Sequence, residues 1–158
     1  MALARILVDG FSLLHNWPEL ARGEPRHTAA ARDELVWVLT QYADACGAPI
    51  TVIFDGGGAP PGTPKARPSG AVEVLYSRAG QTADDLIERL TYRLQPFGEV
   101  LVVTDDLAER GTALAFGGST SSCRSFIQSI EDTLGELAHA LRAHNRREQA
   151  GFKARRGI

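Results

Sequence analysis

Six aspartates stand where strands are predicted to end or where a helix is predicted to begin. Asp9 follows the apolar run 5–8, Asp55 follows 50–54, the pair Asp105 and Asp106 follows 100–103, and Asp84 and Asp85 open a predicted helix. Parallel strands bring their carboxyl ends to one edge of a sheet, so we expect these side chains to lie close together. Carboxylates placed this way raise each other's pKa unless protons or cations intervene. A hard divalent cation such as Mg²⁺, which prefers oxygen ligands, is the economical partner.

An aspartate at a strand end also commonly forms an Asx turn or caps the next helix. The two roles can be separated near Thr82. With Thr82 as N-cap, Asp85 stands at the third helical position and can close a capping box, whereas Asp84 has no such bond and is the better metal ligand. Of Asp105 and Asp106, one is expected to cap the next helix and the other to face the cleft.

The elements that would position these acids alternate in type along the chain. Apolar runs predict strands at 5–8, 50–54, 72–76 and 100–103, and a fifth within 113–118. Apolar spacings of three and four predict helices from Thr28 to Cys46, over 82–95, briefly after 106, and from about 121 to the low 140s. This alternation is typical of an α/β fold in which a mainly parallel sheet is covered on both faces.

The charge of the chain is distributed unevenly. Its 158 residues are the length of one domain, and the net charge is −2. Residues 142–158 contain six basic side chains and one acid, which gives +5, whereas the first 141 residues carry eleven bases and eighteen acids, which gives −7. We expect a folded domain over 1–144 and a flexible basic C-terminal extension over 145–158.

Two further segments could bind phosphate. The run Gly117–Ser122, which includes Ser119 and Ser121, leads into the last predicted helix, where free N–H groups can bind an anion. Ordinary capping by one of its hydroxyls is an equally good interpretation. Lys65 and Arg67, in the Gly/Pro-rich segment 56–70, could reach a nucleic-acid backbone or could simply keep that loop solvated.

Several classes of protein are excluded by what the sequence lacks. It contains no GxxxxGK[ST], GxGxxG or GxSxG motif and no His/Cys spacing for zinc. A haloacid-dehalogenase-type phosphatase would need a second acid where Phe11 stands. Cys46 and Cys123 form no CxxC pair and are interpreted as reduced core thiols. No apolar run predicts a signal peptide or membrane span, so the expected location is cytoplasmic.

Four motifs, taken in order, resemble the bacterial YacP-type NYN-domain proteins of the PIN-like nuclease superfamily. The resemblance covers roughly residues 4–141 and is carried by Asp-Gly-Phe-Ser-Leu-Leu at 9–14, Val-Ile-Phe-Asp-Gly at 52–56, Gln-Thr-Ala-Asp-Asp-Leu-Ile-Glu at 81–88 and Val-Val-Thr-Asp-Asp at 102–106. It implies a three-layer α/β/α sandwich and an endoribonuclease dependent on Mg²⁺ or Mn²⁺. The implied partner is RNA, including messenger RNA on the ribosome, and the sequence leaves monomer and homodimer both open.

The resemblance assigns roles to particular residues. Asp9, Asp84 and Asp106 match the catalytic, metal-binding acids, and Asp55 matches a further acid. The chain departs from the family pattern at Ser12, where asparagine is usual, at Asp105, where serine is usual, and at Arg110, where glutamine is common. These departures keep open a second hypothesis, a catalytically inactive RNA- or ribosome-binding module with the same fold.

Binding of RNA to an acidic site would need surrounding hydrogen-bond donors and basic groups. The C-terminal arginines are additional candidates for this role, although a merely solubilising extension is an equally open interpretation. The expected contacts are Ser12, Lys65, Arg67, Arg78, Ser119, Ser121 and Arg124.

Overall fold

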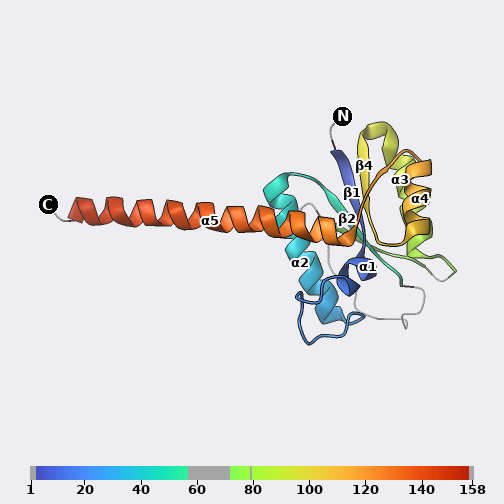
Figure 1. Cartoon of the computed structure of the whole chain (residues 1–158), viewed down its shortest axis with the longest axis horizontal. Helices are drawn as coiled ribbons and strands as arrows, with labels where there is room; N and C mark the ends of the chain where they lie inside the picture. Colours follow the sequence, from blue (N-terminus) through green and yellow to red (C-terminus); the bar gives the residue numbers. More distant parts are fainter. Residues whose placement is uncertain (1–2, 57–71, 79, 157–158) are drawn as a thin grey trace.

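The computed structural model describes residues 3–56, 72–78 and 80–156, the last five of them as backbone. The elements alternate between strands and helices, as the sequence predicts (Figure 1). In chain order they are β1 (Leu3–Asp9), α1 (Gly10–His15), α2 (Ala29–Cys46), β2 (Ile50–Phe54), β3 (Val72–Tyr76), α3 (Ala83–Leu94), the 3₁₀ turn η1 (Gln95–Phe97), β4 (Glu99–Val103), α4 (Leu107–Ala115), β5 (Ser119–Ser121) and α5 (Cys123–Arg156).

The five strands form one parallel sheet in the order β3-β2-β1-β4-β5. The chain moves outward from β1 through β2 to β3, and α3 then carries it back to β4 on the other side of β1. The strand order therefore reverses between β1 and β4. In open α/β sheets, ligands bind outside the carboxyl ends of the strands at such a point. Asp9 ends β1 there, and Asp105 follows β4.

Helices cover both faces of the sheet, which confirms the predicted three-layer α/β fold. On one face, α1, α2 and the first turns of α5 pack over Ile6, Val8 and Val52. On the other face, α3 and α4 pack over Leu7 and Ile53. Neighbouring residues of β1 thus point to opposite layers, and both layers are apolar, as expected for a parallel sheet buried on two sides.

Most of the predicted ends of helices and strands are confirmed. Thr28 caps α2 through its side chain, and Gly47 ends α2 in the left-handed conformation with φ of 75°. Strands β2 and β3 have the predicted bounds. The fifth strand lies after the predicted segment, because 113–115 still belong to α4. The short helix α1, which begins directly after Asp9, was not predicted.

Helix α5 is longer than its apolar pattern predicts. It continues from Cys123 to Arg156 and extends away from the sheet beyond its contact with α2 (Figure 1). The expected end in the low 140s was therefore too early, although the division at residue 144 and the mobility of 145–158 stay predictions. Cys123 is buried as expected, whereas Cys46 is exposed at the end of α2, so its assignment to the core was wrong.

No helix within residues 3–56, 72–78 and 80–156 combines the length and the apolar character needed to cross a membrane.

Candidate metal centre

Three carboxylates from three different elements converge at the carboxyl edge of the sheet. Asp9 ends β1, Asp84 lies in the first turn of α3, and Glu109 lies in the first turn of α4. One carboxylate oxygen of each lies within 4.8 Å of the other two. The structure thus brings together two of the acids predicted from the sequence and adds one that was not.

Asp9 is held by the start of α1. As N-cap of this helix, it accepts a hydrogen bond at Oδ1 from the backbone N–H of Ser12, at 3.3 Å. The backbone at Gly10 passes so close to the sheet that a Cβ there would clash with the buried Phe54 ring, so the turn requires glycine. Burial raises the pKa of the Asp9 carboxyl, the Ser12 hydrogen bond partly offsets this, and the nearby Asp84 charge raises it again.

The Asp84 carboxylate takes no part in capping α3, because the neighbouring Asp85 fills that role. Thr82 Oγ1 accepts from the Asp85 N–H at 3.2 Å, and Asp85 Oδ2 accepts from the Thr82 N–H at 3.1 Å. This is the predicted capping box. It occupies the carboxylate of Asp85 and leaves Asp84, the preceding residue, to face Asp9 and Glu109.

Glu109 is the most unusual member of the cluster. The residue is only 4% exposed, and neither of its carboxylate oxygens has a hydrogen-bond partner among the described residues. Burial, the adjoining Asp84 carboxyl and the charges of Asp9 and Asp106 together raise the pKa of its carboxyl from 4.5 to about 10, and burial contributes most. A buried carboxyl without a donor is costly unless a proton or a cation neutralises it.

Glu109 was not among the predicted ligands, because the spacing of its segment has an ordinary structural interpretation. Asp106-Leu-Ala-Glu109 has the spacing of a capping box, in which the glutamate would bond back to the N-cap residue. In the structure, the Asp106 N–H donates to Thr104 Oγ1 instead, so Glu109 is not used for capping. The available signal was its position four residues before Ala113, on the buried side of α4.

The two acids after β4 are engaged with the backbone. Asp106 Oδ1 accepts from the N–H groups of Ala108 and Glu109, at 2.9 and 3.2 Å, and so caps α4. Asp105 Oδ1 accepts from the Cys123 N–H at 2.8 Å, and the Asp105 N–H donates to Ser12 Oγ at 3.2 Å. Neither belongs to the three-carboxylate cluster. Asp106 instead fixes the helical turn that carries Glu109.

Asp55 also lies outside the cluster, at the end of β2. The Ser77 hydroxyl donates to Asp55 Oδ1 at 3.0 Å and accepts from the Gly56 N–H at the same distance. These bonds join the ends of β2 and β3.

The residues expected to contact RNA are spread over the molecule. Arg78 and Arg124 are exposed, and Arg124 follows Cys123 at the start of α5. Ser119 is in register with Leu101, in the middle of β4, and its hydroxyl donates to Glu99 at the amino-terminal end of that strand, which is the end away from Asp9. Lys65 and Arg67 lie outside the described residues.

The predicted anion site before α5 is already engaged by the protein itself. The first turn of the helix binds the Asp105 carboxylate through Cys123, and Ser122 Oγ accepts from the Ser125 N–H at 3.1 Å. Ser121 Oγ donates to the carbonyl of Ser122. Arg110, one of the departures from the family pattern, donates from Nε to the Thr104 carbonyl at 2.9 Å and braces the segment between β4 and α4.

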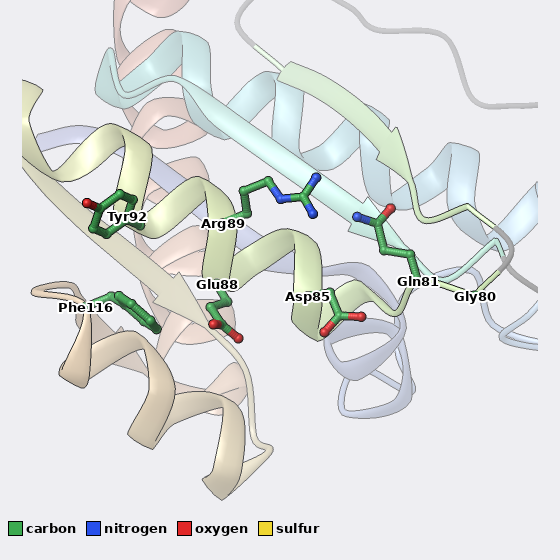
Figure 2. Close-up of a pocket in the computed structure, with 7 residues that line it drawn as sticks. All are labelled: Gly80, Gln81, Asp85, Glu88, Arg89, Tyr92 and Phe116. Atoms are coloured by element: carbon green, nitrogen blue, oxygen red, sulfur yellow. The ribbon is translucent and has the colours of Figure 1, made fainter.

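A surface groove of about 510 Å³ begins beside this edge of the sheet and follows the outer side of α3 (Figure 2). It starts near Asp85, the neighbour of Asp84, and reaches Tyr92 and Phe116, whose rings meet edge to face at 5.9 Å. The groove is lined by both acidic and basic side chains, so its charge does not favour a particular class of ligand. Its lining residues are Gly80, Gln81, Asp85, Glu88, Arg89, Tyr92 and Phe116.

The three-carboxylate cluster fits a divalent cation. It offers only hard oxygen ligands, which suit Mg²⁺ and Mn²⁺. The buried oxygens of Glu109 have no donor among the described residues, so either a proton or a cation must neutralise the charge that they would otherwise share with Asp9 and Asp84. Asp9, Asp84 and Glu109 are therefore the residues placed to hold such an ion.

Comparison with known proteins agrees with this fold. The family model described as the YacP-like NYN domain matches residues 6–156. A protein of Bacillus subtilis (strain 168) named uncharacterized protein YacP is 26% identical over 147 residues, which is 92% of this chain and 86% of that protein. The crystal structure of Rae1 (YacP) from Bacillus subtilis matches with a TM-score of 0.75 and 25% identity, covering 96% of this chain and 86% of that chain.

The structure of the W164L mutant of the same Bacillus subtilis protein matches with a TM-score of 0.76 and 25% identity, covering 90% of this chain and 84% of the mutant. Fold, motif order and family model agree over nearly the whole chain. The chain belongs to the YacP-like NYN domain family, whose fold is that of the PIN-like nucleases.

Proposed function

We propose that this chain is a divalent-metal-dependent endoribonuclease that hydrolyses RNA phosphodiester bonds at Asp9, Asp84 and Glu109. The observation that supports it best is the buried Glu109 carboxylate, which has no hydrogen-bond donor among the described residues and lies within 4.8 Å of two further carboxylates. A purely structural acid would be expected to have such donors. Membership of a nuclease-like family makes RNA the expected substrate.

A divalent cation held here would neutralise charge on the scissile phosphate and lower the pKa of a bound water. The chain's own residues prepare that site. The Ser12 N–H orients Asp9, the capping box directs Asp84 away from the helix backbone, and Asp106 fixes the turn of Glu109. We therefore assign Asp106 a positioning role and give the third direct carboxylate to Glu109.

Without a cation, the cluster repels the phosphates of RNA. Placing a phosphate at the cluster for cleavage therefore requires the metal, whereas exposed cations nearby can hold other phosphates of the RNA without it. Arg124 is the best placed of the described candidates, because the preceding residue, Cys123, is bonded to Asp105 beside the site. Arg78 is a second exposed candidate. Ser119 is not included, because its hydroxyl donates to Glu99 at the end of β4 away from Asp9.

The proposal is tested by incubating the purified protein with end-labelled structured and unstructured RNAs, in Mn²⁺, in Mg²⁺ and in EDTA. We expect internal cleavage with at least one of the metals and none in EDTA. An Asp9→Asn preparation made in parallel identifies contaminating nucleases, because it should be inactive. Binding of the RNAs without metal-dependent cleavage would refute the enzyme and favour an inactive RNA- or ribosome-binding module.

A further inference from the structure

Helix α5 changes character along its length. Up to Ile130 it buries Cys123, Phe126 and Ile127 in the core, and Leu134 packs at the edge of that core. Beyond this point the helix leaves the body of the protein, as Figure 1 shows in orange and red. Leu137 and Leu141, the last leucines of the helix, are already 44% and 53% exposed. The next residue, Arg142, is the first of three arginines within residues 142–151.

Residues 142–151, the part of the projecting segment whose side chains are described, carry two arginines on one face, and a third, Arg147, points to another side of the helix. Arg142, Asn145, Arg146 and Gln149 follow one another at spacings of three, one and three, which places them on the same side of a helix. The single acid of this segment, Glu148, lies about half a turn away from Arg142 and Arg146. It pairs with His144, with 3.9 Å between His144 Nε2 and Glu148 Oε1.

The guanidinium groups of this face are available to a ligand. Arg146 donates only from Nε to the Arg142 carbonyl, at 3.4 Å, and no described carboxylate forms a salt bridge with Arg142 or Arg146. Two like charges four residues apart disfavour an isolated helix. A helix that projects without a packing partner is already marginal in water. An anion bound along this face would relieve the repulsion and stabilise the helix.

We propose that residues 142–151 of α5 form an arm that binds RNA phosphates at a distance from the carboxylate cluster. Arginine suits this ligand because its guanidinium can form paired, charge-assisted hydrogen bonds to phosphate oxygens. A second copy of the chain fits this surface less well, because a coiled-coil interface needs an apolar stripe along the helix and the stripe of α5 ends at Leu141. The inference deepens the proposed function, since it assigns the same substrate a second contact.

The helix sets the distance between the two contacts. The backbone N–H of its first residue, Cys123, donates a hydrogen bond to Asp105 beside the cluster. At about 1.5 Å per residue, Arg142 lies about 29 Å along α5 from that point. With about 3.4 Å per stacked nucleotide, this corresponds to about nine nucleotides. At this stacked spacing, a short RNA at the carboxylate cluster does not reach the arm, whereas a long RNA does.

The test compares R142Q/R146Q with wild type on oligoadenylates, whose bases stack, of about 5 and about 30 nucleotides, chosen to lie below and above this reach. Binding is measured by fluorescence anisotropy in EDTA over a range of salt concentrations. For the longer RNA we expect at least about fivefold weaker binding and a log–log salt slope smaller by about 1.4, because two phosphate contacts are lost. Cleavage of the shorter RNA in Mn²⁺ should stay at the wild-type rate.

The matched control is R22Q/R93Q, which removes the same charge from exposed positions on the body. Equal losses in both double variants would show a net-charge effect and overturn the arm. So would unchanged binding of the longer RNA by R142Q/R146Q. A third contradictory result is a wild-type dimer, seen by sedimentation, that dissociates in L137S/L141S with loss of RNA binding. Because binding is measured in EDTA, failure of cleavage leaves this test intact, and failure of the arm leaves the cleavage proposal intact.

Discussion

Asp84→Asn should reduce metal-dependent RNA cleavage more than about 100-fold, since even substitutions behind a direct metal ligand commonly cost 10- to 100-fold. The fold should remain intact. Asp84 is exposed and takes no part in the capping box of α3, so the amide removes a metal ligand without removing a helix contact. Initial cleavage rates in Mn²⁺ and urea unfolding measured on the same preparation separate the two effects.

Asp85→Asn is the matched control, one residue along the same helix. Its carboxylate accepts from the Thr82 N–H and belongs to the capping box rather than to the cluster. We expect a loss of about 1 kcal/mol in the free energy of unfolding, as for other N-terminal caps. Cleavage should stay within a few-fold of wild type. Equal loss of cleavage in both variants, or wild-type cleavage by Asp84→Asn, would contradict the assignment of these two neighbours.

Glu109→Gln should make the metal-free protein more stable while removing metal-dependent cleavage. The wild-type carboxyl is buried beside Asp9 and Asp84 and has no donor among the described residues. At neutral pH the folded wild type must keep Glu109 protonated, which costs free energy because the unfolded chain has lost that proton. The amide is neutral at every pH and can donate to the two carboxylates without that cost. We expect a gain of more than about 1 kcal/mol at neutral pH, or about 2–4 °C in Tm per kcal/mol for a chain of this size.

The pH dependence of this gain follows from the raised pKa of Glu109. Its carboxyl titrates at about 10 in the fold and at 4.5 ordinarily, so between these values the folded state holds a proton that the unfolded state has lost. The metal-free wild type should therefore lose stability as pH rises from about 4.5 towards 10. Glu109→Gln should show a shallower loss, and the two proteins should converge below pH 4.5.

Thermal unfolding in EDTA from pH 4 to 9, with and without added Mn²⁺, measures both effects. Mn²⁺ should stabilise the wild type, because a ligand that binds only the folded state raises its stability, and should barely affect Glu109→Gln. A less stable Glu109→Gln protein that still responds to Mn²⁺ would show that Glu109 is a structural acid.

Local signals predicted most of the fold. A continuous apolar run located β2, because a central parallel strand is buried on both faces, and the alternating pattern of 72–76 located β3. The pattern Thr82-Ala-Asp-Asp85 predicted the start of α3 and separated Asp84 from Asp85, because capping depends only on neighbouring residues. Parallel strand ends then placed Asp9 and Asp84 at one edge of the sheet.

The remaining features depend on contacts between distant segments. Glu109 joins the cluster because β4 pairs with β1, which brings the start of α4 next to Asp9. The spacing of residues within 105–110 does not reveal this pairing. Asp105 accepts a hydrogen bond from the backbone N–H of Cys123, eighteen residues away, so this contact could not be predicted from its position after the strand. The length of α5 was underestimated because its apolar pattern ends at Leu141, whereas the helix continues without a packed face.

Diffraction from crystals soaked in Mn²⁺ tests the central claim most directly, because the anomalous signal locates the ion independently of any activity. We expect one peak or more bonded to carboxylate oxygens of Asp9, Asp84 and Glu109, with the Glu109 oxygens no longer without a partner. The peak should disappear in Asp84→Asn crystals and persist in Asp85→Asn crystals. An ordered cluster with no anomalous peak at millimolar Mn²⁺, or a peak bound elsewhere, would contradict the proposed metal centre.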